Sequence, residues 1–242
     1  MGKKLKVQRR GRGTAVFRAK KTGKIAPIRY PNRETGNING VVRDLLHEPG
    51  RGAPLAYVEL EGGSGYYVAA PEGIYIDQSV SIGQDAPLQI GNVLPVGSIP
   101  EGTMVCNVEL KPGDGGRMAR SSGSFATVVS HMGNQTVLKL PSRRNIDISS
   151  DCRATIGIVA GGGRKEKPFT KAGERHYIMK AKGHIYPIAK GVKMTAASHP
   201  HGGGRKRRPG KSTTVSKNAP PGAKVGLIGA RSSGRKKRRR GV

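Results

Sequence analysis

Basic and acidic residues are strongly segregated along this 242-residue chain. Residues 1–33 contain 12 lysines and arginines and no acidic residue, and residues 175–242 contain 19 and none. Residues 34–116 contain 11 acidic and 3 basic residues, and residues 117–174 contain 4 and 10. A highly cationic segment with few apolar residues cannot bury enough surface to fold alone. We therefore expect the middle of the chain to fold and both ends to be basic extensions.

The net charge indicates a polyanionic partner. It is +29 at pH 7, and nucleic acid is the commonest partner of such a chain, with an acidic membrane surface as the alternative. No apolar run approaches the ~20 residues that span a bilayer, and the start, MGKKLKVQRRGRG, lacks the apolar part of a signal peptide. Cys106 and Cys152 form no paired motif, which fits a reducing compartment. We therefore expect a cytoplasmic protein.

Two sets of short apolar runs occupy the middle of the chain, separated by segments rich in turn-forming residues. The first set is 38–48, 54–61, 65–71 and 78–83, and the second is 124–131, 136–141, 145–150 and 153–161. Short strands at this spacing are typical of small antiparallel barrels rather than of alternating strands and helices. Helical periodicity is weak throughout, and the only short candidates lie near 43–47 and 116–120. The sequence thus predicts a mainly β protein.

Composition also changes between the two sets of runs. The segment 109–123 is rich in Gly, Pro and Ser, and the charge balance changes sign there. Such segments commonly mark loops or domain boundaries. We therefore expect four parts, namely a basic arm, two β-barrels and a basic extension: 1–33, 34–112, 113–192 and 193–242.

The segment SHPHGGGRKRRPGK, residues 198–211, admits three chemical interpretations. A zinc site needs more ligands than His199 and His201, and no acidic residue or cysteine follows them. A Walker phosphate loop requires a glycine where Arg205 stands. An enzyme acting through His199 lacks a nearby carboxylate to orient the ring. The sequence therefore predicts no metal ion, no cofactor and no catalytic residue.

Contact with structured RNA fits the segment better. Three glycines let backbone N–H groups approach phosphates, the basic run 205–208 supplies charge, and the histidines can stack on bases. A second glycine-then-basic segment, GGGRKEKPFTKAGERH, occupies residues 161–176. No helix-turn-helix or zinc-finger pattern is present, which disfavours sequence-specific reading of duplex DNA. Two alternatives stay open: a solvated basic tail, and an RNA chaperone or DNA-packing protein that acts by charge alone.

Ordered blocks across nearly the whole chain resemble one known family. They are QRRGRGTAVFR (8–18), DLLHEPGRGAPLA (44–56), IGNVLPVGSIPEGTMVCNVE (90–109), KPGDGG (111–116), ARSSGSFATVVSH (119–131), CRATIGIVAGGGRKEKPFTKAG (152–173), SHPHGGG (198–204) and GKSTTVSKNAPPGAKVGLI (210–228). Together they are similar to the universal second protein of the large ribosomal subunit, in its archaeal and eukaryotic form. The resemblance implies an OB-like barrel followed by an SH3-like barrel, with long basic N- and C-terminal extensions.

The same resemblance implies a structural, non-enzymatic role in translation. Family members bind large-subunit ribosomal RNA, support subunit association and shape the RNA around the peptidyl-transferase centre. The expected partners are that RNA, other ribosomal proteins and the small subunit at the intersubunit face, with no membrane. The expected RNA-binding residues are Arg9, Arg10, Arg12, Arg18, Arg117, Arg120, Arg164, Lys165, Lys167, Lys171, His199, Gly202, Gly203, Gly204, Arg205 and Lys211.

The chain departs from the family pattern just before the histidine loop. The family's acidic residue before His-Pro is replaced by Ser198, and Lys193 and Thr195 also differ from the usual pattern. A carboxylate that could orient His199 is therefore missing. The sequence predicts that RNA or the protein backbone holds this imidazole instead.

Overall fold

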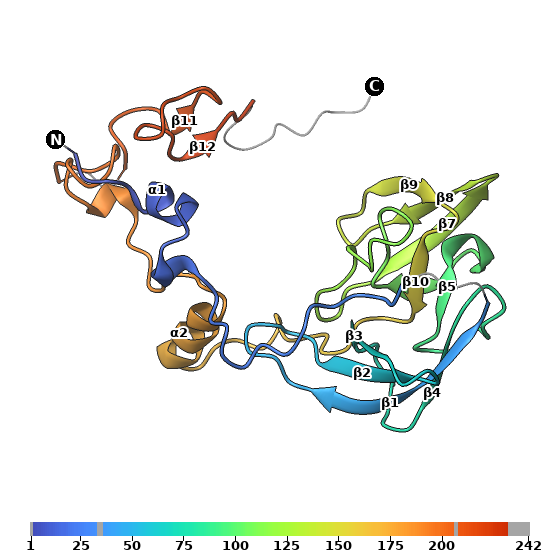
Figure 1. Cartoon of the computed structure of the whole chain (residues 1–242). Helices are drawn as coiled ribbons and strands as arrows, with labels where there is room; N and C mark the ends of the chain where they lie inside the picture. Colours follow the sequence, from blue (N-terminus) through green and yellow to red (C-terminus); the bar gives the residue numbers. More distant parts are fainter. Residues whose placement is uncertain (1, 33–35, 206–207, 232–242) are drawn as a thin grey trace. The chain divides into compact units, whose positions relative to one another are not determined.

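The computed structural model describes residues 2–32, 36–205 and 208–231 and divides into two compact units. The β unit is Lys21–Ala172, and the arm unit combines Met1–Lys20 with Gly173–Val242 (Figure 1). The two ends of the chain, far apart in sequence, thus belong to one unit. Part of the predicted basic run (206–207) and the last residues (232–242) lie outside the described residues.

Ten strands of the β unit pair in one sheet within the described residues. In chain order they are β1 (Ile38–Leu46), β2 (Leu55–Leu60), β3 (Gly65–Ala69), β4 (Ser79–Ile82), β5 (Val93–Pro95), β6 (Met104–Cys106), β7 (Ala126–Met132), β8 (Gln135–Lys139), β9 (Asn145–Ser149) and β10 (Arg153–Ile156). Their order in the sheet is β3-β2-β1-β4-β5-β10-β6-β7-β8-β9. The mainly β architecture is therefore confirmed, and all eight predicted apolar runs contain strands.

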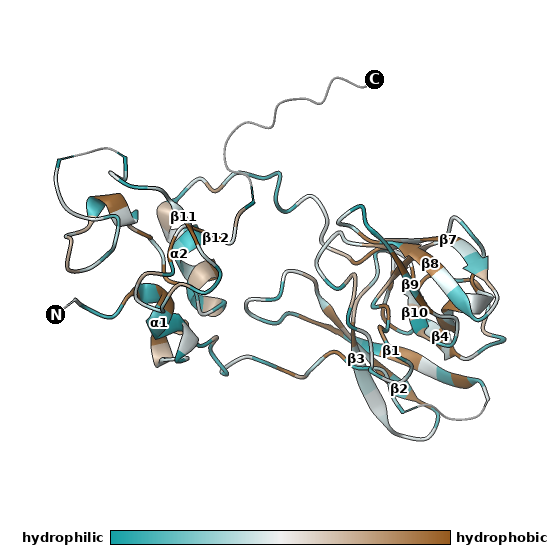
Figure 2. Ribbon diagram, turned by 90° about the horizontal axis from the view of Figure 1, so that it is seen from above, coloured by the Kyte–Doolittle hydropathy of each residue, from teal (hydrophilic) through white to brown (hydrophobic). Residues whose placement is uncertain are grey.

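The sheet has two halves, each with its own hydrophobic core. The first core lies among β1 to β4 and includes Val42, Val58 and Val80. The second lies among β5 to β10 and includes Val128 and Leu138. Both halves contain a register irregularity, between Val42 and Asp44 in β1 and between Val128 and Ser130 in β7. Such bulges bend a strand, as closing a small barrel requires. Figure 2 shows the apolar segments concentrated in these strands.

Two strands, β5 and β6, were not predicted because each is only three residues long. Both pair antiparallel with β10, and β5 also pairs parallel with β4. β5 therefore joins the two halves of the sheet, although it lies in a segment with no recognisable alternation. The four-part division into 1–33, 34–112, 113–192 and 193–242 stays a prediction.

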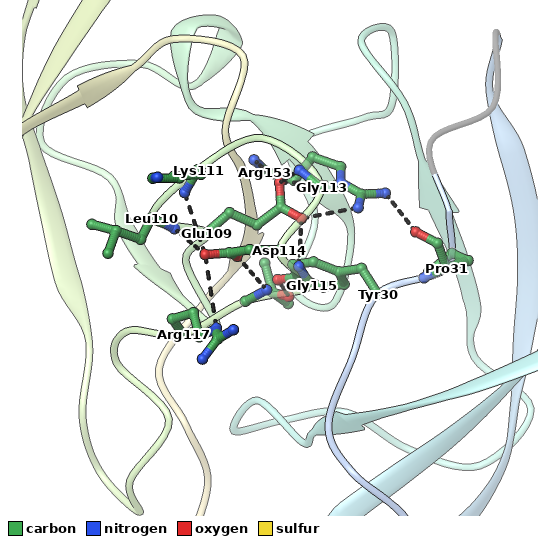
Figure 3. A network of polar contacts seen from close by, with 12 residues as sticks. Tyr30, Pro31, Glu109, Leu110, Lys111, Gly113, Asp114, Gly115, Arg117 and Arg153 are labelled. Atoms are coloured by element: carbon green, nitrogen blue, oxygen red, sulfur yellow. Dashed lines mark hydrogen bonds and ion pairs between the residues drawn. The ribbon is translucent and has the colours of Figure 1, made fainter.

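A buried ion pair lies where the segment before β1 meets the second half of the sheet (Figure 3). The Arg153 Nη2 donates to Glu109 Oε1 at 2.9 Å, and both side chains are almost fully buried. The backbone N–H of Gly115 donates to the same carboxylate at 3.0 Å. Arg153 Nη1 also donates to the carbonyl of Pro31 at 3.0 Å, and its guanidinium lies 5.3 Å from the ring centroid of Tyr30. Glu109 and Arg153 therefore hold residues 30–31 in place.

The arm unit contains short elements only. They are α1 (Lys6–Gly11), η1 (Ala15–Phe17), η3 (Gly191–Lys193) and the parallel pair β11 (Thr214–Val215) and β12 (Leu227–Ile228). The helix α2 (Ala172–Ala181) starts at the boundary with the β unit. No described helix has the length and hydrophobicity that crossing a membrane would require.

Both weak helical predictions were wrong. Residues 43–47 mostly belong to β1, because the strand pairs with β2 and β4 and places Val42 in a core. Residues 116–120 form no helix, and Met118 instead pairs with Val108 in an isolated bridge. The helices α1 and α2 were not predicted because neither buries a side chain, so no apolar face marks them in the sequence.

Candidate RNA-binding surfaces

The histidine loop of the arm unit is built by its own backbone. His199 N–H donates to the Thr195 carbonyl at 3.2 Å, and Gly202 N–H donates to the His199 carbonyl at 2.9 Å. The N–H of Gly203 returns to the carbonyl of Met194 at 3.1 Å. A Cβ at position 202 would overlap the carbonyl oxygens of residues 194 and 195, so this turn requires glycine.

The imidazole of His199 is held by the backbone. Its Nδ1 accepts the N–H of His201 at 3.1 Å, and its ring lies against Gly191, where a Cβ would overlap it. Accepting at Nδ1 requires the neutral ring, with the proton on Nε2. Partial burial, followed by the effect of His201, lowers the pKa of His199. The backbone N–H of His201 therefore orients the ring in a loop where Ser198 supplies no carboxylate.

The N-terminal segment packs against this loop within the arm unit. The N–H of Lys3 donates to the carbonyl of Ala197 at 2.9 Å. Gly183 is buried against the backbone of Arg18 and Ala19, where a Cβ would come within 2.6 Å of both. These contacts bring the predicted arm residues and the histidine loop into one unit. The predicted cations of this unit are exposed: Arg9, Arg10, Arg12, Arg18, Arg205 and Lys211.

A cluster of arginines lies on the β unit. Arg120 is half-buried and donates to the carbonyl of Gly116 at 2.8 Å, while Arg117 is exposed beside it. Burial, and then repulsion from Arg51 and Arg117, lowers the pKa of Arg120. Arginine nevertheless stays charged at neutral pH. Glu48 pairs with Arg51 at 3.0 Å and Asp114 lies 3.9 Å from Arg117, so the three guanidinium groups outnumber two carboxylates. The excess positive charge suits the cluster to a phosphate.

The second glycine-then-basic segment extends this cluster. Arg164 Nη2 donates to Ser122 Oγ at 3.1 Å, and its guanidinium lies so close to Gly52 that a Cβ there would overlap it. Gly52 follows Arg51, and Ser122 stands two residues after Arg120, so Arg164 joins the same surface. Its neighbours along the chain are all exposed: Lys165, Lys167 and Lys171. We call Arg51, Arg117, Arg120 and Arg164 the arginine cluster.

The predicted residues thus divide into two groups, one in each unit. Arg51 was not predicted, although its place in the turn EPGRGAP of an otherwise acidic segment could have marked it. Within residues 2–32, 36–205 and 208–231, no three His, Cys, Asp or Glu side chains gather as a metal site would require. RNA contact by each of these residues stays a prediction.

Comparison with known proteins assigns both parts of the chain to one family. Residues 2–82 match the family model "Ribosomal Proteins L2, RNA binding N-terminal domain", and residues 89–223 match "Ribosomal Proteins L2, C-terminal domain". These two domains agree with the expected OB-like barrel followed by an SH3-like barrel.

Similar curated proteins carry the name large ribosomal subunit protein uL2. That of Korarchaeum cryptofilum is 53% identical over 240 residues, covering 99% of this chain and 98% of the relative. That of Hyperthermus butylicus is 51% identical, covering 98% of this chain and all of the relative. That of Methanobrevibacter smithii is 48% identical, covering 98% of this chain and all of the relative. The similarity therefore extends over both units.

Proposed function

The chain belongs to the ribosomal protein L2 family, and from this premise we propose that it is a structural, RNA-binding protein of the large ribosomal subunit. In this proposal the arm unit and the arginine cluster are the RNA contacts. One observation carries the assignment of the arm unit: residues 1–20 and 175–242 contain no acidic side chain, and both belong to this unit. The cationic ends of the chain therefore act together.

The physical basis is phosphate neutralisation. Each lysine or arginine that pairs with a phosphate releases condensed counterions, so affinity falls steeply as salt rises. The backbone N–H groups and glycine turns of residues 202–204 allow close approach to the RNA backbone. Ribosomal RNA and ribosomal proteins are the partners that family membership gives.

Three finer parts of the function are proposed with it. The histidine loop helps to shape RNA around the peptidyl-transferase centre, and the chain supports association with the small subunit at the intersubunit face. The protein works in cytoplasmic ribosomes, as the sequence led us to expect. It performs no catalysis of its own, which the absence of any Asp or Glu in residues 175–242 supports, since an acid–base histidine normally has an orienting carboxylate.

Sedimentation tests the assignment to the large subunit. Lysate is fractionated on a sucrose gradient before and after a high-salt wash, and each fraction is probed for the chain. We expect the protein to migrate with large subunits and to remain there after the wash, as an integral component of the subunit would. Recovery only from light fractions would contradict the proposal and favour a chaperone or DNA-packing protein that acts by charge alone.

A single substitution tests the role of the histidine loop. We expect ribosomes that carry only His199→Ala protein to retain the chain but to join subunits or synthesise peptide more slowly. The matched control is His184→Ala, which removes an exposed histidine of the same unit. Normal translation by fully mutant ribosomes would refute the role of His199. RNA cleavage or nucleotide turnover by the purified protein, lost in His199→Ala, would show an enzyme instead.

A further inference from the structure

A small apolar cavity opens within the arm unit beside the histidine loop. Its volume is about 180 Å³, and its apolar walls include Val7, Phe17, Ile185, Ile188, Met194 and Val225. Val7 and Ile188 are 58% and 63% exposed, so the walls are left to solvent in the protein alone. We propose that this cavity receives one unstacked nucleobase of ribosomal RNA. The inference rests on the proposed function and names the RNA group that this site would bind.

The charge around the cavity favours a nucleotide over an apolar side chain of another protein. Lys6 and Arg10 line it together with the apolar residues. The sequence on both sides of the cavity, residues 1–20 and 175–242, contains no acidic residue. A nucleotide combines an apolar base face with an adjacent phosphate, which matches apolar walls beside cationic side chains. A purely apolar partner would gain nothing from the two charges.

Stacking surfaces are present in the same wall. The guanidinium carbon of Arg10 lies 5.9 Å from the ring centroid of Phe17, and both side chains line the cavity. Aromatic rings and guanidinium planes are the surfaces on which proteins stack unpaired RNA bases. The base would therefore find a planar partner as well as an apolar enclosure.

The histidine supplies a polar group at the edge of the cavity. His199 lines it, and because Nδ1 accepts the N–H of His201, the proton of the neutral ring is on Nε2. Among the residues that the structure describes, this Nε2–H has no hydrogen-bond partner. It can donate to a ring nitrogen or a carbonyl oxygen of a base. The size also fits one base, since pockets for larger ligands usually measure about 300–1,000 Å³.

Blocking the cavity in the full-length protein tests the inference. Ala189 is an exposed residue of its wall, and Ala189→Trp would fill it without removing a charge. We expect about tenfold weaker binding to large-subunit ribosomal RNA transcribed in vitro, which corresponds to one lost stacking contact. The slope of log affinity against log salt should fall by at most about 1, because only the phosphate next to the displaced base can lose its contact. The matched control is Ala223→Trp, an exposed alanine of the same unit outside the cavity, with wild-type affinity expected.

A second variant identifies the occupant. p-Benzoylphenylalanine replaces Phe17 in intact large subunits, and the cross-links formed on irradiation are mapped. A cross-link to one nucleotide of the RNA supports the inference, whereas a cross-link to a polypeptide overturns it. Wild-type affinity of Ala189→Trp would also overturn it while leaving RNA binding by the protein intact. Failure of the wild-type protein to bind this RNA would instead overturn the proposed function itself.

Discussion

The β unit and the arm unit obtain their structure from different sources. In the β unit, side chains such as Val42, Leu55 and Leu138 are completely buried. In the described part of the arm unit, the buried apolar side chains are those of Leu5 and Val225. Since burial of apolar surface is the dominant favourable contribution to folding, the β unit can be stable by itself. The arm unit depends on backbone hydrogen bonds and close glycine contacts, and we infer that RNA completes its stability.

The difference also separates two uses of charge. The β unit buries the ion pair of Glu109 with Arg153 and satisfies it with further hydrogen bonds. Described cations of the arm unit, such as Arg9, Arg12 and Arg18, are exposed to solvent, where a polyanion can reach them. One arrangement holds the chain together, and the other attracts a partner. Four experiments, from the largest expected effect to the smallest, test this comparison.

Removing the buried carboxylate should have the largest effect. Glu109→Ala leaves Arg153 charged, buried and without its partner, which typically costs about 3–5 kcal/mol of folding stability. Urea unfolding of the full-length protein, followed by circular dichroism, measures the change. The control is Glu59→Ala, which removes a half-exposed partner of Arg43 and should change stability little. Equal losses of folding stability in the two variants would show that the buried pair stabilises the β unit no more than an exposed pair does.

Removing charge from the arm should affect RNA binding rather than folding. A triple variant, Arg9→Gln, Arg12→Gln and Arg18→Gln, should lower the salt slope of ribosomal RNA affinity by about 2 to 3, with an unchanged urea midpoint. Filter binding over a range of salt concentrations measures the slope. The matched control replaces three basic residues around the β8–β9 turn by glutamine: Lys139, Arg143 and Arg144. If the control lowered the slope equally, the arm residues would contact no more RNA phosphates than other basic residues of the protein do.

A methyl group in the histidine loop should have an intermediate, local effect. Gly203 has φ +92°, and a Cβ there would lie 3.2 Å from that of Ala196, so Gly203→Ala is strained. A cost of about 1–2 kcal/mol would reduce RNA affinity severalfold without changing the β unit. Gly62→Ala is the control, because its Cβ would meet nothing within 4 Å. An unchanged affinity for Gly203→Ala would mean that RNA does not need this loop conformation.

The titration of His199 should show the smallest effect. Burial, and then the neighbouring His201, lowers the pKa of His199, so the folded loop favours the neutral ring. The contribution of this ring to loop stability is therefore complete above the ordinary pKa of about 6.5 and is lost as pH falls through the lowered value. Histidine signals followed by NMR from pH 8 to pH 4.5 give the pKa directly.

The substitution His201→Gln refines that measurement. It should raise the pKa of His199 only partly toward the ordinary value, because burial is the larger cause of the shift. A wild-type pKa at or above 6.5 would contradict the expectation that the folded loop favours the neutral ring, whose Nδ1 accepts the N–H of His201.

Patterns of apolar residues in the sequence predicted the longer strands but not the elements that form only through contacts with distant segments. β4 alternates polar and apolar residues and β2 nearly does, so their existence could be predicted from the sequence. β5 and β6 are too short for any period to appear, and they exist because β10 pairs with both. The helix α2 buries no side chain, so the sequence contains no apolar stripe that would indicate a helix there. Arg51 was missed for a similar reason, because its neighbours Arg117 and Arg120 are distant in sequence.

The sequence by itself determined the division of charge, the mainly β character, the family and the glycines of the histidine loop. Each of these depends on residue types and on spacings along the chain. Only the tertiary structure decided that both basic ends form one unit, that Glu109 reaches Arg153, and that the backbone of His201 holds the ring of His199. These features depend on contacts between distant residues, which local chemistry permits but does not specify.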